Sequence, residues 1–91
     1  MKRTMVTVVI PNYNGLRFME DCFAALDLQV YRHFKVLVVD NGSTDGSAEW
    51  LKERGIPTIF LEKNTGFSGA VNVGIRTADT PYVILLNNDT E

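Results

Sequence analysis

Four short runs of aliphatic and β-branched residues, each followed at once by polar residues or glycine, constrain the fold of this chain most strongly. The runs lack apolar–polar alternation, which is typical of strands buried on both faces of a parallel sheet. Open parallel sheets bind their ligands at the edge where the carboxyl ends of the strands gather. The pattern therefore predicts a parallel sheet with a polar, ligand-binding edge. The runs cover residues 6–10, 36–39, 58–61 and 82–86.

The segments between these runs carry helical signals. Apolar residues at helical spacing predict an amphipathic helix over about residues 16–28. Residues 48–54 predict a second helix, capped by Ser43 or Thr44 and stopped by Gly55. A third helix is predicted to pack on the sheet through a face that contains small residues. That face comprises Phe67, Val71, Gly74, Ile75 and Ala78.

The predicted order of elements is β-α-β-α-β-α-β. Connections of this length exclude hairpins and favour right-handed crossovers, so we expect a three-layer α/β/α fold with a mainly parallel sheet. Because the sequence stops directly after a strand and its polar tail, we expect the 91 residues to be part of a longer domain. The sheet edge left open in this way predicts a homodimer through that face, which light scattering at high concentration would detect.

Composition excludes several classes of protein. With 45% hydrophobic and 22% charged residues, the chain is expected to be an ordered globular protein. A net charge of -2 and the absence of any basic run longer than two residues argue against nucleic-acid binding. No segment approaches the roughly 20 apolar residues that span a bilayer, and no signal peptide is evident. The lone Cys22 cannot form an intrachain disulfide, so we expect a cytoplasmic protein.

Asp40 is the strongest functional candidate because it directly follows the second aliphatic run. A carboxylate at such a strand end can accept hydrogen bonds from a nucleotide base or ribose, and bonds to charged groups contribute roughly 1.5–3 kcal/mol each. The alternative is a structural role in which Asp40 caps backbone N–H groups of the following turn. We favour the ligand contact.

Three other clusters are weaker candidates when each is taken alone. Asp89 could hold a divalent ion only with help from substrate phosphates, because it is a single carboxylate flanked by amides. Residues 64–69 precede a helix and form a candidate anion site, or else serve close helix–sheet packing. Tyr13 could stack on a base or simply cover the edge of the core.

Taken together, these segments resemble the start of a family 2 glycosyltransferase of the GT-A fold, and the ending resembles its rhamnosyltransferase-like branch. The resemblance covers nearly the whole chain, in order and at similar spacing. It implies that residues 1–91 are the nucleotide-sugar-binding, N-terminal half of such a domain, in an enzyme of polysaccharide biosynthesis. The matching segments are residues 8–15, 38–47, 64–67, 72–75 and 85–91.

The resemblance also implies roles for individual residues. Asp40 would accept a hydrogen bond from the base N–H, and Asp89 would hold Mg²⁺ or Mn²⁺ against the diphosphate of a UDP- or dTDP-sugar. Asn87 stands where the family's Asp-x-Asp motif has its first acid, so Asp89 is the only carboxylate expected to bind the metal. Pro11 and Tyr13 would line the base pocket, and Asn41 and Ser43 would shape the adjoining loop. The other residues implied to contact the nucleotide are Asn64, Gly66, Gly69, Asn72 and Asn88.

No catalytic residue is expected among the 91 residues, because the family's base lies well downstream of the metal motif and is therefore expected beyond Glu91. The isolated chain is expected to bind nucleotide weakly and to transfer no sugar, while the complete enzyme could lie at the inner face of the membrane. Two alternatives remain open. One is a non-catalytic nucleotide-binding or scaffolding domain, and the other is a Rossmann dinucleotide-binding domain, whose closely spaced glycines are missing from residues 11–15.

Overall fold

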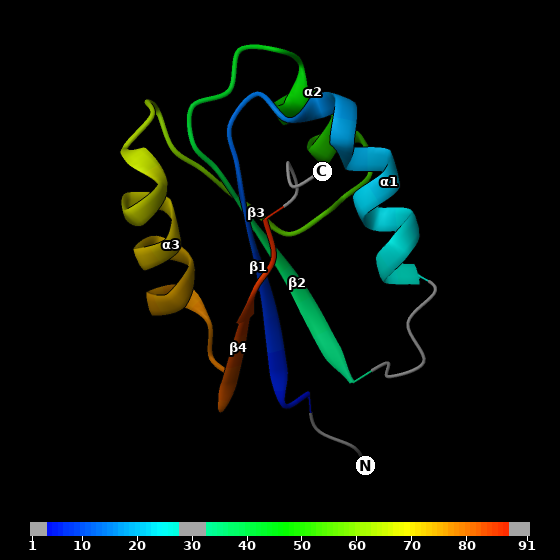
Figure 1. The fold of residues 1–91 in the computed structure, drawn as a ribbon, viewed down its shortest axis with the longest axis vertical. Helices are drawn as coiled ribbons and strands as arrows, with labels where there is room; N and C mark the ends of the chain where they lie inside the picture. Colours follow the sequence, from blue (N-terminus) through cyan, green and yellow to red (C-terminus); the bar gives the residue numbers. More distant parts are fainter. Residues whose placement is uncertain (1–3, 28–32, 88–91) are drawn as a thin grey trace.

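The computed structural model describes residues 4–27 and 33–87, which form a sheet of four parallel strands alternating with helices (Figure 1). The expected order of elements is confirmed. Each strand lies within two residues of its predicted bounds, although Asp40 closes the second strand where a loop residue was predicted. In chain order the elements are β1 (Val6–Asn12), α1 (Leu16–Asp27), β2 (Phe34–Asp40), α2 (Ser47–Glu53), β3 (Thr58–Phe60), α3 (Gly66–Thr77) and β4 (Tyr82–Leu85).

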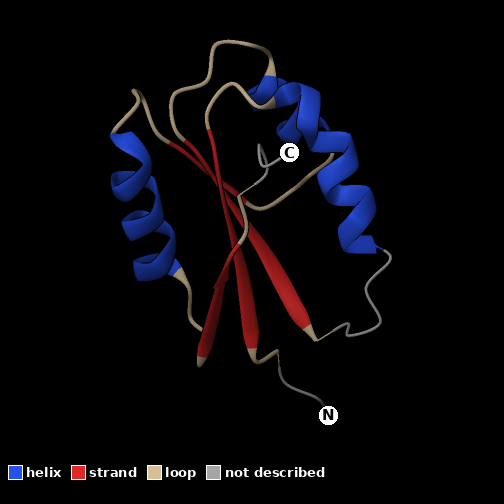
Figure 2. Cartoon of the chain, in the orientation of Figure 1, coloured by secondary structure: helices blue, strands red, loops and turns tan. Residues whose placement is uncertain are grey.

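The strand order β3-β2-β1-β4 brings the chain back past its starting strand. Helices α1 and α2 carry it outward from β1 to β3, and α3 then returns it to the other side of β1. Because right-handed crossovers running in opposite directions cover opposite faces, α3 lies across the sheet from α1 and α2 (Figure 2). The predicted three-layer α/β/α architecture is confirmed.

Successive residues of the central strands point to opposite faces and build two core clusters. Gly74 marks how closely α3 approaches its face, because a Cβ there would lie only 2.4 Å from Cγ1 of Val9. A glycine at this position is therefore explained by helix–sheet packing. The cluster on the face covered by α1 and α2 comprises Val8, Ile10, Met19, Val38 and Leu51, and the cluster on the face covered by α3 comprises Val9, Val39 and Ala70.

Two details of the predicted helices are wrong. Phe67 and Ile75 were placed on the packing face of α3, but they are 55% and 49% exposed. The helix buries Ala70 and Gly74 instead, because only small side chains fit at its close contact with the sheet. Helix α2 begins after Gly46, whose φ of 96° is left-handed, and neither of the two predicted hydroxyl residues caps it.

Strand β4 forms an open edge of the described sheet. All four of its residues are between 37% and 63% exposed, from Val83 to Tyr82. Homodimer formation through this edge stays a prediction, because a single chain is described. No helix within the described residues is long and apolar enough to cross a membrane.

Candidate functional site

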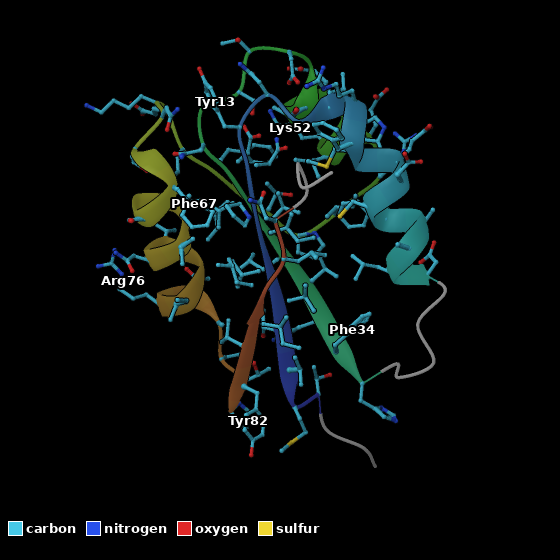
Figure 3. The ribbon with its side chains drawn as sticks, in the orientation of Figure 1. Tyr13, Phe34, Lys52, Phe67, Arg76 and Tyr82 are labelled. Atoms are coloured by element: carbon cyan, nitrogen blue, oxygen red, sulfur yellow. The ribbon has the colours of Figure 1, made fainter. Side chains whose placement is uncertain are left out.

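The loops that follow β1, β2 and β3 meet at the carboxyl edge of the sheet, as the strand pattern predicts. Tyr13 lies there, whereas Tyr82 lies at the opposite end of the sheet (Figure 3). The parallel register places Asn12, the last residue of β1, directly beside Asp40, the last residue of β2. Both side chains are almost completely buried, at 1% and 2% exposure.

The Asp40 carboxylate accepts three hydrogen bonds from its surroundings. Oδ1 accepts from Asn12 Nδ2 at 2.9 Å and from Ser43 Oγ at 2.8 Å, and Oδ2 accepts from the Ser43 backbone N–H at 3.2 Å. Asp40 therefore does cap the turn after β2, which was the structural alternative. All three donors are neutral groups, so no cation in the described part of the chain offsets this buried charge.

Ser43 ties the loop after β2 to the loop after β1. While its hydroxyl donates to Asp40, the same oxygen accepts from Asn12 Nδ2 at 3.2 Å and from the Asn14 backbone N–H at 2.9 Å. Asn14 has a φ of 52°, a conformation that asparagine tolerates better than most residues, and its Oδ1 accepts from the Thr44 N–H at 2.7 Å. With one donor and two acceptor positions occupied, the Ser43 hydroxyl serves mainly to hold these loops.

Asp45 joins the starts of α1 and α2. Its Oδ2 accepts from the Leu16 N–H at 2.9 Å, and its Oδ1 accepts from the N–H and hydroxyl of Ser47 at 3.0 and 2.5 Å. Slight burial acts to raise the pKa of Asp45, but the hydrogen bonds from Ser47 and Leu16 outweigh it, so the pKa lies below its ordinary value.

Replacing Asp45 with asparagine keeps an acceptor oxygen but removes the negative charge beside two helix N-termini, so the free energy of unfolding at pH 7 should fall by about 0.3–1 kcal/mol. Because the folded-state pKa is lower than the unfolded value of about 3.9, this stabilisation is present above that pH and disappears as the pH falls further. Urea unfolding of wild type and Asp45→Asn at pH 7 and pH 3 should show a difference that shrinks in acid. Asp21→Asn, which changes an exposed acid on α1, is the control; a difference for Asp45→Asn that persists unchanged at pH 3 would contradict the prediction.

Asn41 connects the loop after β2 to the start of α3. Its Nδ2 donates to Asn64 Oδ1 and to the Gly66 carbonyl, both at 3.0 Å. Its Oδ1 accepts from the Thr65 N–H and Oγ1 at 2.8 and 2.9 Å. The side chain is only 4% exposed, so Asn41 positions the loop before α3.

Gly42 allows the same two loops to touch. Its φ is 79°, and a Cβ at this position would lie between 2.7 and 2.9 Å from backbone atoms of Lys63 and Asn64. At Gly69 a Cβ would instead meet the side chain of Thr65 at 2.6 Å, whereas nothing lies within 4 Å at Gly66. Gly42 is therefore the glycine that brings the loop after β3 against the Asp40 loop.

Three more residues that were predicted to contact the nucleotide differ in their exposure and position. Tyr13 is 49% exposed and available for stacking, whereas Pro11 is buried within β1. Asn72 lies on α3 and is exposed, outside the hydrogen-bonded network of loops. Of these three residues, Tyr13 is therefore the one best placed at the carboxyl edge to contact a ligand.

The predicted metal ligand belongs to a segment that the structure does not describe. Asn88, Asp89 and Glu91 all lie outside the described residues. This geometry therefore tests neither the metal prediction at Asp89 nor the expectation that the catalytic base lies beyond Glu91, and both stay predictions. Among residues 4–27 and 33–87, no group of three His, Cys, Asp or Glu side chains could hold a metal ion.

Sequence reasoning missed Asn12, Asn14 and Asp45 as organising residues. Asn14 carried one usable signal, since asparagine before glycine favours a left-handed turn conformation. Asp45 carried another as an acid shortly before a helix, where caps are common. Asn12 carried none, because its role depends on the register of two strands that are separated by a helix.

The sequence and fold match known proteins. Residues 7–91 match the family model described as glycosyl transferase family 2. Relatives include an uncharacterized glycosyltransferase of Rickettsia felis, 33% identical over 90 residues, and the glycosyltransferase GlyA of Streptococcus pneumoniae, 32% identical over 88 residues. These alignments cover 94% and 92% of this chain but only 15% and 13% of the relatives, so the chain spans a small part of their length.

Two solved structures share the fold closely. One is S. aureus TarS 1-349 in complex with UDP, with a TM-score of 0.83 and 26% identity, covering 93% of this chain and 27% of that chain. The other is the mannosyltransferase PcManGT from Pyrobaculum calidifontis in complex with GDP-Man and Mn²⁺. It has a TM-score of 0.86 and 26% identity and covers 98% of this chain and 28% of that chain.

Proposed function

This chain belongs to glycosyl transferase family 2, and from that membership we propose that its carboxyl edge binds the nucleoside diphosphate of a sugar donor. The observation that carries this proposal is the Asp40 carboxylate, 2% exposed and held by neutral donors alone. Burying a carboxylate without a cation is costly unless hydrogen bonds replace the lost water, and this carboxylate has only neutral donors. A ligand that donates a further hydrogen bond would offset part of that cost.

In this proposal Asp40 and Tyr13 together recognise the base. The carboxylate accepts a hydrogen bond from the base N–H, and the half-exposed Tyr13 ring offers a stacking surface at the same edge. We propose a pyrimidine, as in UDP or dTDP. The bound UDP of TarS supports this choice, whereas the GDP-Man of PcManGT makes guanine the competing base.

A divalent metal, Mg²⁺ or Mn²⁺, is proposed to accompany the diphosphate, with Asp89 as its protein ligand. The Mn²⁺ of PcManGT supports a metal, and magnesium-type ions are commonly held by one or two carboxylates together with substrate phosphates. When bound, such an ion neutralises charge on the departing diphosphate. Sugar transfer to an acceptor hydroxyl is proposed for a protein of the relatives' length.

Cellular context is likewise proposed. A relative from Bacillus subtilis, 30% identical over 92 residues, is named as a putative teichuronic acid biosynthesis glycosyltransferase, which supports a role in making polysaccharide. We propose a cytoplasmic location for this chain, which cell fractionation would test.

Calorimetric titration of the chain with UDP, dTDP, GDP and NAD, each with and without Mn²⁺, tests the proposed function. We expect a pyrimidine diphosphate to bind and Mn²⁺ to strengthen its binding. Preference for GDP would show that the base is guanine and not a pyrimidine, and preference for NAD would support a Rossmann-type site instead. If a folded chain binds none of the four, the proposal that these residues form a donor site by themselves is wrong.

A further inference from the structure

We propose that Asn12 is a positioning residue for the Asp40 carboxylate, which it orients so that Oδ2 receives the nucleotide base. This inference rests on the proposed function, because it concerns how the same site recognises its donor. Asn12 itself touches no ligand in this proposal. Its side chain acts through Asp40 and Ser43, to which Nδ2 donates at 2.9 and 3.2 Å.

The bonds to Asp40 are distributed unevenly between its two oxygens. Each carboxylate oxygen offers about two acceptor positions. Both positions of Oδ1 are occupied, by the Asn12 amide and the Ser43 hydroxyl, whereas Oδ2 accepts one bond of 3.2 Å from the Ser43 N–H. Within the described residues, the remaining acceptor position therefore lies on Oδ2.

Asn12 is suited to hold this arrangement because it is itself fixed on several sides. The strand register pairs it with Asp40, and its carbonyl accepts the Asn41 N–H at 2.8 Å. Its side chain is 1% exposed, so few other orientations are open to the amide. Without this donor only Ser43 would hold the carboxylate, and the base would lose part of a preorganised partner.

Two substitutions of Asn12 and one control test the inference by UDP titration with Mn²⁺. Asn12→Ala removes the donor and should weaken UDP binding about tenfold, because a less firmly held carboxylate makes a weaker charge-assisted bond to the base. Thr7→Val is the control, because Thr7 is another buried polar residue of β1 and loses its hydrogen bond to the Thr80 hydroxyl, at 2.7 Å. Its pairing with β4 places it at the far end of the sheet. Thr7→Val should leave the UDP dissociation constant within about twofold of wild type.

Asn12→Asp adds a readout that loss of stability alone would not produce. It places a second carboxyl in hydrogen-bonding contact with Asp40, and two such groups share a proton because both cannot ionise easily. Relative to wild type at the same pH, Asn12→Asp should bind UDP weakly at pH 8 and recover as the pH is lowered toward 5. Asn12→Ala has no such proton and should stay weak at both pH values.

The outcomes separate this inference from the proposed function. If wild type binds UDP and Asn12→Ala binds it equally well despite lower stability in urea, Asn12 is only structural and the inference is wrong. The inference would also be contradicted if the UDP affinity of Asn12→Asp, relative to wild type, were the same at pH 8 and pH 5. If the wild-type chain binds no nucleotide at all, the proposed function fails first, and this inference falls with it.

Discussion

Replacement of Asp40 by alanine is expected to weaken binding of the preferred nucleotide by roughly 10- to 150-fold, because a hydrogen bond to a charged group contributes about 1.5–3 kcal/mol. The same change removes the acceptor of the Ser43 N–H and one of the acceptors of the Asn12 amide, which keeps its bond to Ser43 Oγ. Unsatisfied buried donors cost about 1–3 kcal/mol, so the free energy of unfolding should fall as well. Calorimetric titration gives the affinity, and urea unfolding gives the stability.

Asp79→Ala is the matched control for this prediction. Asp79 is also an aspartate, but its side chain is 73% exposed and pairs with Lys35, whose register places it toward the amino end of β2. An exposed ion pair contributes little to stability, so both the nucleotide affinity and the free energy of unfolding of Asp79→Ala should stay close to the wild-type values. A folded Asp40→Ala variant that binds nucleotide like wild type would refute the assignment of Asp40 to the donor site.

Replacement of Gly42 by alanine is expected to damage both the fold and the site. The φ of 79° disfavours any residue with a Cβ, at a cost of about 1–2 kcal/mol. The new Cβ would also overlap backbone atoms of Lys63 and Asn64, which cannot rotate away as a side chain can, and such overpacking typically costs a further 1–3 kcal/mol. Urea unfolding should therefore show a loss of about 2–5 kcal/mol in total.

Gly55→Ala is the control that separates the conformational cost of a positive φ from the cost of overlap with neighbouring backbone atoms. Its φ of 64° is also left-handed, but nothing lies within 4 Å of the position that a Cβ would occupy. It should lose only the conformational cost of about 1–2 kcal/mol and keep its nucleotide affinity. Gly42→Ala should additionally weaken nucleotide binding, because the displaced loop is the one that Asn41 holds. Equal stability losses in the two variants would show that the loop contact at Gly42 is unimportant.

The arrangement of strands and helices could be read from local patterns because burial on both faces leaves an aliphatic run wherever a parallel strand passes through the core. The same patterns located Asp40 at a strand end. They were less reliable for helix faces. Phe67 fits a helical stripe but is exposed, because the close approach of α3 to the sheet admits only the small residues near Gly74.

Some residues of the candidate site could also be predicted from the sequence, and others could not. Asp40 and Tyr13 could be named from their positions after predicted strands and from the family resemblance. The partners of Asp40 could not, since Asn12 lies 28 residues away in sequence and meets it only through the register of β1 and β2. Asn41 was expected to shape the loop beside Asp40, but its partners lie 23 to 25 residues further on and could not be named from the sequence.

The sequence by itself determined the order of elements, the parallel sheet and the edge at which polar residues collect, because these follow from burial and chain connectivity alone. Only the tertiary structure decided which oxygen of Asp40 keeps an acceptor position open and which loops touch at Gly42. Those features depend on contacts between segments that are distant in sequence. Strand register and helix–sheet distance set such contacts, and both emerge only when the whole chain packs.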